Sequence, residues 1–232
     1  MILIINLLYI LIACVCAGAT PIRFDEEQTI ISNRIPSEIE AASIARTLVF
    51  RESLTNINTI KKIISNGIHK SIPVSSVEYY VDVDEDGDPY LLLVDIGSTN
   101  QNIIKGSEFS LTIRVGDHPT NDDVNEEYPG GIENSPAGSP RVQLTGKLVN
   151  KTYKNPLDID LIKLETAFLR RHPDARYWLP NSIVSPHKSH WVKFKVEDIY
   201  LIGGFGDRAY IGSIDPEIYH SVGTIPDADS SL

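Results

Sequence analysis

The sequence predicts a mainly β domain, a closed or split barrel with peripheral helices. Six short segments alternate apolar and polar residues or form brief apolar runs, as β-strands do. Only three segments carry the spacing or capping signals of helices, too few for a parallel sheet in which helices alternate with strands. The 232 residues are enough for one domain with a hydrophobic core of its own.

The chain begins with an apolar segment, residues 1–19, which we expect to be a cleaved secretory signal. It is apolar from Ile2 to Val15 except for Asn6, and small residues follow at 17–19. An N-terminal membrane anchor is the alternative, although the run is shorter than the ~20 residues of a membrane span. No later stretch is apolar enough to span, so we expect no membrane span after cleavage.

The mature chain is expected to be acidic and free of thiols. Both cysteines, Cys14 and Cys16, lie in the apolar segment, which excludes disulfides, thiolate metal sites and cysteine nucleophiles after cleavage. The net charge is −10, and residues 1–19 contribute nothing to it. Because such a surface repels phosphate backbones, nucleic acid is not an expected partner. In a secretory protein, Asn150 in Asn150-Lys151-Thr152 is a candidate glycosylation site.

A polar leader (residues 20–36) precedes the predicted domain (residues 37–222), and a C-terminal tail (residues 223–232) follows it. The domain opens with a helix, because Ser37 and Glu40 have the spacing of a capping box and apolar residues follow at helical intervals. A second helix is predicted at residues 156–171 with Asn155 as its cap, and a short third one opens at Asp215-Pro216.

Six strands are predicted, and one long acidic segment separates the fourth from the fifth. They are residues 57–64, 75–84, 89–96, 108–115, 141–149 and 190–202. Residues 116–140, rich in Gly, Pro, Asn and acidic side chains, are too long for a routine connection. We therefore expect a flexible or functional loop insertion there.

The aspartates of residues 82–88 raise the question of a calcium loop. Asp82, Asp84, Asp86 and Gly87 match positions 1, 3, 5 and 6 of such a loop. Position 12, however, is Leu93, inside an apolar strand that supplies no carboxylate. Asp-Gly between two segments of period two is a hairpin signal, so a hairpin is the preferred interpretation and weak surface cation binding the alternative.

The histidines and glycines do not complete a catalytic or metal motif. His187 and His190 are interpreted as part of a solvated loop, and His172, before Pro173, as the end of a helix. The sequence contains no nucleophile elbow, Walker loop or zincin motif. No catalytic or metal-binding residue is therefore assigned.

Four stretches in order resemble the CREG family of secreted glycoproteins: ARTLVFRE, PRVQLTGKLV, RRHPDARYWLP and FKVEDIYLIGGFGDRAYIGSIDPEIYHSV. The resemblance covers Ser37 to Val222 and implies the six-stranded FMN-binding split barrel of the pyridoxamine 5′-phosphate oxidase superfamily. It also implies a homodimer in the secretory and endolysosomal system that binds other proteins, with an insertion blocking the flavin pocket. GGFGDRA looks closer to branches that bind flavin or haem, so either cofactor stays open.

Basic side chains that converge with polar groups would be needed to hold a flavin phosphate. The candidates, on this alternative only, are Lys61, Lys62, Arg114, Arg141, Lys147 and the polar run Ser98, Thr99, Asn100 and Gln101. An ordinary solvent-facing role is the competing interpretation for the strand residues, because they alternate with apolar neighbours.

The leading hypothesis is a secreted or vacuolar-lysosomal glycoprotein that forms a homodimer, binds an unidentified protein partner and needs no cofactor. The alternative is an FMN- or haem-binding oxidoreductase of the same fold. Whether the protein is an enzyme is left open, with the non-enzymatic hypothesis preferred.

Overall fold

The computed structural model describes residues 34–180 and 182–227. The predicted signal segment, the leader up to residue 33 and the last five residues of the tail lie outside this part. Within the described ranges no helix has the length and apolar character needed to cross a membrane.

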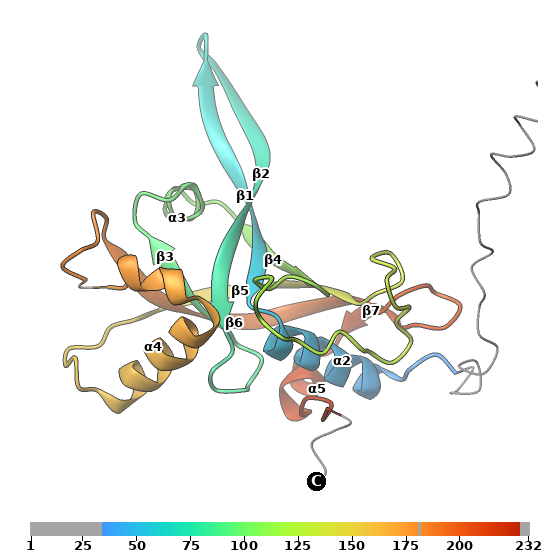
Figure 1. The fold of residues 1–232 in the computed structure, drawn as a ribbon. Coiled ribbons are helices and arrows are strands. Elements are labelled where there is room, and N and C mark those ends of the chain that lie inside the picture. The colour runs from blue at the N-terminus through green and yellow to red at the C-terminus, as the bar shows by residue number, and fades with distance from the viewer. Residues whose placement is uncertain (1–33, 181, 228–232) are drawn as a thin grey trace, which may run out of the picture. The chain divides into compact units, whose positions relative to one another are not determined.

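Seven antiparallel strands form one sheet (Figure 1): β1 Leu54–Ser65, β2 Ile68–Val81, β3 Tyr90–Val94, β4 Phe109–Arg114, β5 Arg141–Lys151, β6 Ser189–Ile202 and β7 Ile211–Ile214. Their order is β3-β2-β1-β4-β5-β6-β7, and β3 also pairs with β6. The first six strands of this order therefore close into a ring, which confirms the mainly β barrel. The six predicted strands are all present, whereas β7 was not predicted.

β6 is the strand on which the ring and the seventh strand both depend. One of its edges pairs with β5, while the other pairs with β3 through residues 189–193 and with β7 through residues 199–202. The β5–β6 ladder contains a bulge between Thr145 and Gly146. A Cβ at Gly146 would lie 1.9 Å from the Lys195 carbonyl oxygen, so only glycine fits where the two backbones approach.

The main core lies between the inner face of the strands and α2 (Glu38–Arg51). The predicted capping box is present, since the Ser37 side chain accepts a hydrogen bond from the Glu40 amide and the Glu40 carboxylate accepts one from the Ser37 amide. The apolar side of α2 packs into the core through Ala41, Ala45 and Leu48. α5 (Pro216–Ser221) lies beside α2 and begins where the short third helix was predicted to open, with Asp215 as its N-cap.

A second core lies on the outer face of β3 and β6, under α4 (Ile159–Arg171) and a short 3-10 helix, η3 (Pro173–Tyr177). The predicted start of α4 at residue 156 was wrong. Asp158, rather than Asn155, caps the helix by accepting from the Asp160 amide. The Asn155 side chain accepts from Leu157 instead, so it orders the turn that precedes the helix.

His172 ends α4 as predicted, but its setting does not favour a charged side chain. The ring is buried, stacks on Tyr79 and has its Nε2 3.2 Å from the Tyr80 carbonyl oxygen. Burial lowers the pKa of His172. The neutral imidazole is therefore a packing residue rather than a positive charge at the helix end.

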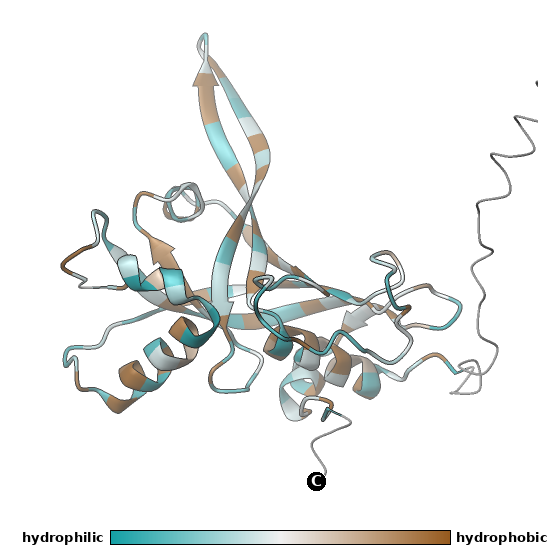
Figure 2. Ribbon diagram, in the orientation of Figure 1, coloured by the Kyte–Doolittle hydropathy of each residue, from teal (hydrophilic) through white to brown (hydrophobic). Residues whose placement is uncertain are grey.

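β1 and β2 continue beyond the barrel as a long hairpin, and we call its outer part, residues 60–73, the arm (Figure 1). Asn66 and Gly67 form its tip, both with positive φ (51° and 75°), as a two-residue hairpin turn requires. Apolar and polar residues alternate along the arm in Figure 2. The predicted strand at residues 75–84 thus begins seven residues earlier, at Ile68.

The predicted insertion, residues 116–140, is an irregular loop that lies against the C-terminal end of α2. Tyr128 reaches the main core, and Arg51 Nη1 donates to the carbonyl oxygens of Asn125 and Glu127. The buried Glu52 carboxylate accepts from the Gly116 amide and lies 2.7 Å from His118 Nδ1. These contacts attach the loop to the helix at several points.

Candidate functional site

The aspartate-rich segment is the loop between β2 and β3, residues 82–89, and the predicted hairpin is confirmed by the pairs Tyr80–Leu91 and Val81–Tyr90. Gly87 has a φ of 81°, and a Cβ there would lie 2.7 Å from the Arg46 side chain and the Tyr219 ring. The Gly87 amide donates to Asp82 Oδ2. Glycine is therefore required at this position by conformation and by space.

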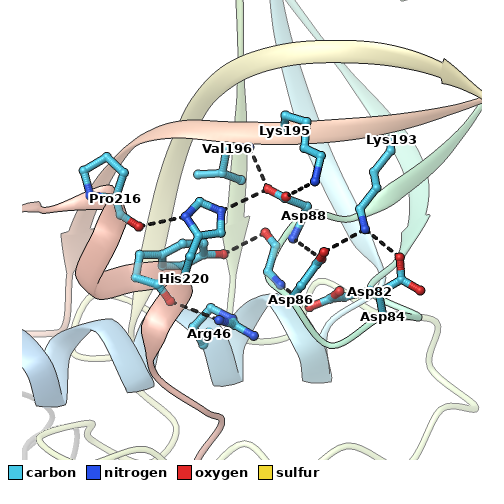
Figure 3. Close-up of polar contacts among 12 residues, drawn as sticks. Arg46, Asp82, Asp84, Asp86, Asp88, Lys193, Lys195, Val196, Pro216 and His220 are labelled. Atoms are coloured by element: carbon cyan, nitrogen blue, oxygen red, sulfur yellow. Dashed lines mark hydrogen bonds and ion pairs between the residues drawn. The ribbon is translucent and has the colours of Figure 1, made fainter.

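Lys193, from β6, inserts its ammonium group between two of these aspartates (Figure 3). Its Nζ lies 2.6 Å from Asp84 Oδ2 and 2.8 Å from Asp86 Oδ2, and its side chain is only 5% exposed. The Tyr90 hydroxyl donates to the same Asp84 oxygen. A tethered ammonium thus occupies the place between carboxylates that a calcium ion takes in a calcium loop. The positive charge of Lys193 therefore offsets part of the negative charge of the two carboxylates from within the chain.

Asp88 joins the loop to two further elements. It accepts from Lys195 Nζ at 2.8 Å, from the Val196 amide at 2.8 Å, and lies 3.2 Å from Nε2 of His220 on α5 (Figure 3). Burial acts to raise the pKa of Asp88, but these hydrogen bonds outweigh it and hold the pKa below its usual value. Asp88 is therefore a charged junction between the loop, β6 and α5.

Arg46 holds the same loop from the side of α2. This buried guanidinium donates to the carbonyl oxygens of Tyr219 and Val222 at 3.0 and 2.9 Å, and to that of Glu85. Asp82, 4% exposed, has one carboxylate oxygen without a hydrogen-bond partner in the described residues. Burial raises the pKa of Asp82 to about 6. The contacts of these polar residues thus join the β2–β3 loop, β6, α5 and α2. Asp82 is the carboxyl among them that takes up a proton most readily.

The polar run predicted as a phosphate site forms the first turn of an unpredicted helix, α3 (Ser98–Ile104). Thr99 Oγ1 donates to Glu78 Oε1 at 2.6 Å, and Ser98 Oγ lies 3.4 Å from Ser76 Oγ. The side-chain amide groups of Asn100 and Gln101 both donate to the backbone carbonyl oxygen of Asp95. All four side chains are therefore engaged within the chain, next to a carboxylate that would repel a phosphate.

The basic candidates occupy separate places. Lys61 and Lys62 are exposed on the arm and, as successive strand residues, point to opposite faces. Arg114 pairs with Asp117. Arg141 donates to the carbonyl oxygens of Ala137 and Ser139, and Lys147 pairs with Glu197 at 2.5 Å. A single chain does not gather them around one phosphate.

Two further sequence candidates lie near the start of β6 and the end of β5. His190 was interpreted as part of a solvated loop and is also the first residue of the predicted strand 190–202. It lies in β6, and its Nδ1 is 2.8 Å from Asp95 Oδ1. His187 is an exposed loop residue, as expected. Asn150 is exposed near the end of β5, opposite Val192, so its amide is accessible to solvent.

Residues 36–221 match the model of the CREG β-barrel family. The chain belongs to the CREG family. The resemblance found in the sequence is thereby confirmed. Among curated proteins, no sequence matches this CREG-family chain.

Solved structures place this CREG-family chain among known folds. A heme-binding protein from Mycobacterium smegmatis superposes with a TM-score of 0.55 and 21% identity, over 82% of this chain. The chain spans 63% of the length of that protein. A protein of unknown function from Agrobacterium tumefaciens str. C58 gives a TM-score of 0.47 and 15% identity, over 78% of this chain and 65% of that one. At these identities the likeness to the mycobacterial protein shows a shared fold.

Sequence reasoning found the aspartates of this CREG-family chain but missed their partners. Lys193 and Lys195 are 107 to 109 residues away from the aspartates that they bind. A signal was present in the alternation of β6, which sets both lysines on the face opposite Val192 and Phe194. The opposite charges of these two lysines and of the aspartate-rich loop could have suggested that the two segments are in contact.

Proposed function

We propose that this CREG-family protein is a non-enzymatic homodimeric binding module of the secretory pathway, acting outside the cell or in an endolysosomal or vacuolar lumen. One observation carries the proposal, the exposed apolar side chains of the arm. Ile64, Ile68 and Ile72 are 69%, 60% and 41% exposed. By the register of β1 and β2, Ile68 and Ile72 share one face of the arm and Ile64 lies on the other. Exposed apolar groups on a protruding hairpin are typical of surfaces that a partner covers.

The charge of the arm supports a protein partner. Lys61, Lys62 and Lys70 lie among the isoleucines, and no acidic residue occurs from Leu54 to Val77, in a chain with a net charge of −10. The arm of one copy is therefore complementary to the acidic surface of another copy or of a second protein. The engaged side chains of α3 favour this function over phosphate binding.

The test is the oligomeric state measured by light scattering during size-exclusion chromatography. We expect a dimer for the secreted protein and a shift toward monomer for the double variant Ile64→Ser/Ile72→Ser. The control is Ile183→Ser, a fully exposed isoleucine in the loop before β6. A monomeric wild type would contradict the dimer, and a variant that stays fully dimeric would contradict the role of the arm.

The second candidate function is binding of FMN or haem, with oxidoreductase activity. It is favoured by the fold shared with the heme-binding protein from Mycobacterium smegmatis. His190 is the side chain that best fits an iron ligand, because its Nδ1 is held by Asp95 and carboxylate-bound histidines commonly ligate metals through the other nitrogen. Titration with hemin, followed by its Soret band, and with FMN, followed by flavin fluorescence, tests this function. Saturable binding that is lost in His190→Ala supports it, and no saturable change with either cofactor contradicts it.

The secretory address is proposed from the apolar segment and from the exposure of Asn150. Expression in a eukaryotic secretory host should yield protein in the medium with a mobility shift after N-glycosidase treatment. The shift should vanish in Asn150→Gln. A shift that persists in this variant contradicts the assignment of the glycan.

A further inference from the structure

A cavity of about 200 Å³ lies on the outer face of the barrel, bounded by the β2–β3 loop, the end of β5 and α4. Val83 and Leu164 supply apolar lining, and Tyr90 and Tyr153 supply aromatic lining. The volume equals that of about seven water molecules in the liquid, which suits a small ligand. None of its lining residues belongs to the arm or to α3, so the cavity is independent of the proposed function.

Two lysines, Lys151 and Lys163, and two aspartates, Asp84 and Asp160, line the cavity. Asp84 already binds the Lys193 ammonium, which it shares with Asp86, and accepts a hydrogen bond from the Tyr90 hydroxyl. Lys163 Nζ is 3.8 Å from the second Asp84 oxygen, which is a weak additional contact. Lys151 Nζ lies 5.9 Å from the centre of the Tyr90 ring and forms no ion pair with any residue that the structure describes. Two ammonium groups, on β5 and on α4, are thus available to an anion.

The same cavity also presents groups that can bind hydroxyls. The Asp160 carboxylate has neither a hydrogen bond nor an ion pair to its side chain within residues 34–180 and 182–227. The pKa of Tyr153 is raised, first by burial and then by the charges of Asp160, Asp158 and Asp84, so its phenol keeps its proton. A carboxylate that accepts and a phenol that donates or accepts therefore lie beside the two lysines.

We infer that this cavity binds a monosaccharide that carries a phosphate or a carboxylate. The anionic group lies between Lys151 and Lys163, and sugar hydroxyls bind Asp160 and Tyr153. The apolar side of the sugar ring packs against the tyrosine rings. Aromatic and apolar walls with a few placed polar groups are what small-molecule sites share, and charge-assisted hydrogen bonds supply the selectivity for an anion.

Tryptophan fluorescence of the full-length secreted protein reports on this site, because Trp191 pairs with Lys151 in the β5–β6 ladder and belongs to the same core as Tyr90 and Leu164. The probes are glucose 6-phosphate, glucuronate, glucose and inorganic phosphate. We expect saturable changes with the two anionic sugars, and affinities at least about tenfold lower for glucose and for phosphate.

Lys151→Gln and Lys163→Gln should each lower the affinity for the anionic sugars by about tenfold, the size expected for one lost charge-assisted hydrogen bond. Lys151→Gln keeps the glycosylation motif at Asn150, so the glycan is not a variable. The matched control is Lys147→Gln, on the same strand but paired with Glu197, which should leave the affinity unchanged.

If the fluorescence does not change, calorimetric titration measures binding of the same four probes, because it needs no optical signal. Glucose that binds as tightly as glucose 6-phosphate overturns recognition of an anion. Phosphate that binds as tightly as the sugar phosphate means an adventitious ion only and overturns recognition of a sugar. Absence of binding with all four probes, or binding that is indifferent to both lysine variants, overturns the site.

Discussion

Lys193 shows how one residue distant in sequence decides the meaning of a motif. The spacing of Asp82, Asp84, Asp86 and Gly87 could be read directly, and so could the missing acid at Leu93. The sequence predicted the hairpin for these reasons. It could not identify the ammonium that balances the carboxylates, because alternation along a strand gives a side chain's face but not its opposite neighbour.

Calcium should leave the thermal unfolding of the wild type unchanged relative to EDTA, because the Lys193 ammonium already lies between Asp84 and Asp86.

Lys193→Met should reduce the free energy of unfolding by about 2 kcal/mol, less than for a fully buried pair because the carboxylates are partly exposed. Chemical denaturation measures the loss. Lys195→Met, which removes a more exposed partner of Asp88, should cost less; equal losses would contradict the central position of Lys193.

Gly87→Ala should destabilise the protein by about 3 kcal/mol, because the added methyl group meets Arg46 and Tyr219 and the backbone has a positive φ. Gly67→Ala is the matched control. It has a similar φ of 75°, but its Cβ would meet nothing within 4 Å, so only the conformational cost of about 1 kcal/mol remains. Urea denaturation of both variants separates the two costs, and similar values would contradict the packing at Gly87.

At the scale of elements, strong local signals were predictable and short or non-local ones were not. The cap at Ser37 and the proline after Asp215 identified two helices correctly. α3 has no side-chain cap hydrogen bond, so its polar run resembled a loop. β7 has four residues, which is too short for a period to be recognised.

The first part of β2 was missed for a different reason. Residues 68–73 carry polar, apolar and proline residues without a buried face, because both faces of the arm are exposed. Their strand conformation comes from pairing with β1 across the turn at Asn66 and Gly67. The same absence of burial explains why the candidate lysines of the arm could not be given a common site from the sequence.

The arm should be dispensable for the stability of the barrel, because its side chains contribute little to either core. Replacing residues 61–72 by Asn-Gly keeps the Ile60–Pro73 pair and a two-residue turn. We expect circular dichroism and the free energy of unfolding of the monomer to stay within about 1 kcal/mol of the wild type. Loss of the folded state on shortening would show that the arm supports the barrel.

At the scale of the whole molecule, buried carboxyls set the response to pH. The pKa of Asp82 is raised to about 6, and burial also raises the pKa values of Glu52, Glu78 and Glu165. The folded chain therefore takes up these protons at a higher pH than the unfolded chain does. The free energy of unfolding should rise as the pH falls from about 7.5 to about 5.

Three groups act differently in this balance. The lowered pKa of His172 opposes the rise, since the unfolded chain protonates this ring first. The lowered pKa values of Asp84 and Asp88 mean that their contributions are lost only at more acidic pH. Asp82→Asn should flatten the pH dependence and stabilise the protein at about pH 7.5, on the order of 2 kcal/mol. Urea denaturation at both pH values tests this, and a wild type less stable at the lower pH would contradict it.

The class of the fold followed from the number and period of the strands, but the closure of the barrel did not. Closure rests on the pairing of Tyr90 through Val94 with the first residues of β6. Residues 90–94 are apolar, whereas residues 189–193 mix polar and apolar side chains, and neither pattern identifies the strand that it will pair with. The order of the strands is a property of the packed molecule.

The dependence of the ring on β6 has a consequence during synthesis. Until the ribosome has released the chain past residue 202, β3 and β5 each present a free edge, because the strand that pairs with both does not yet exist as a folded element. During most of its translation the nascent chain therefore exposes two unpaired strand edges that can pair with other chains. A product that ends before Ser189 keeps both edges unpaired. The barrel is therefore completed only when residues 189–202 have been synthesised.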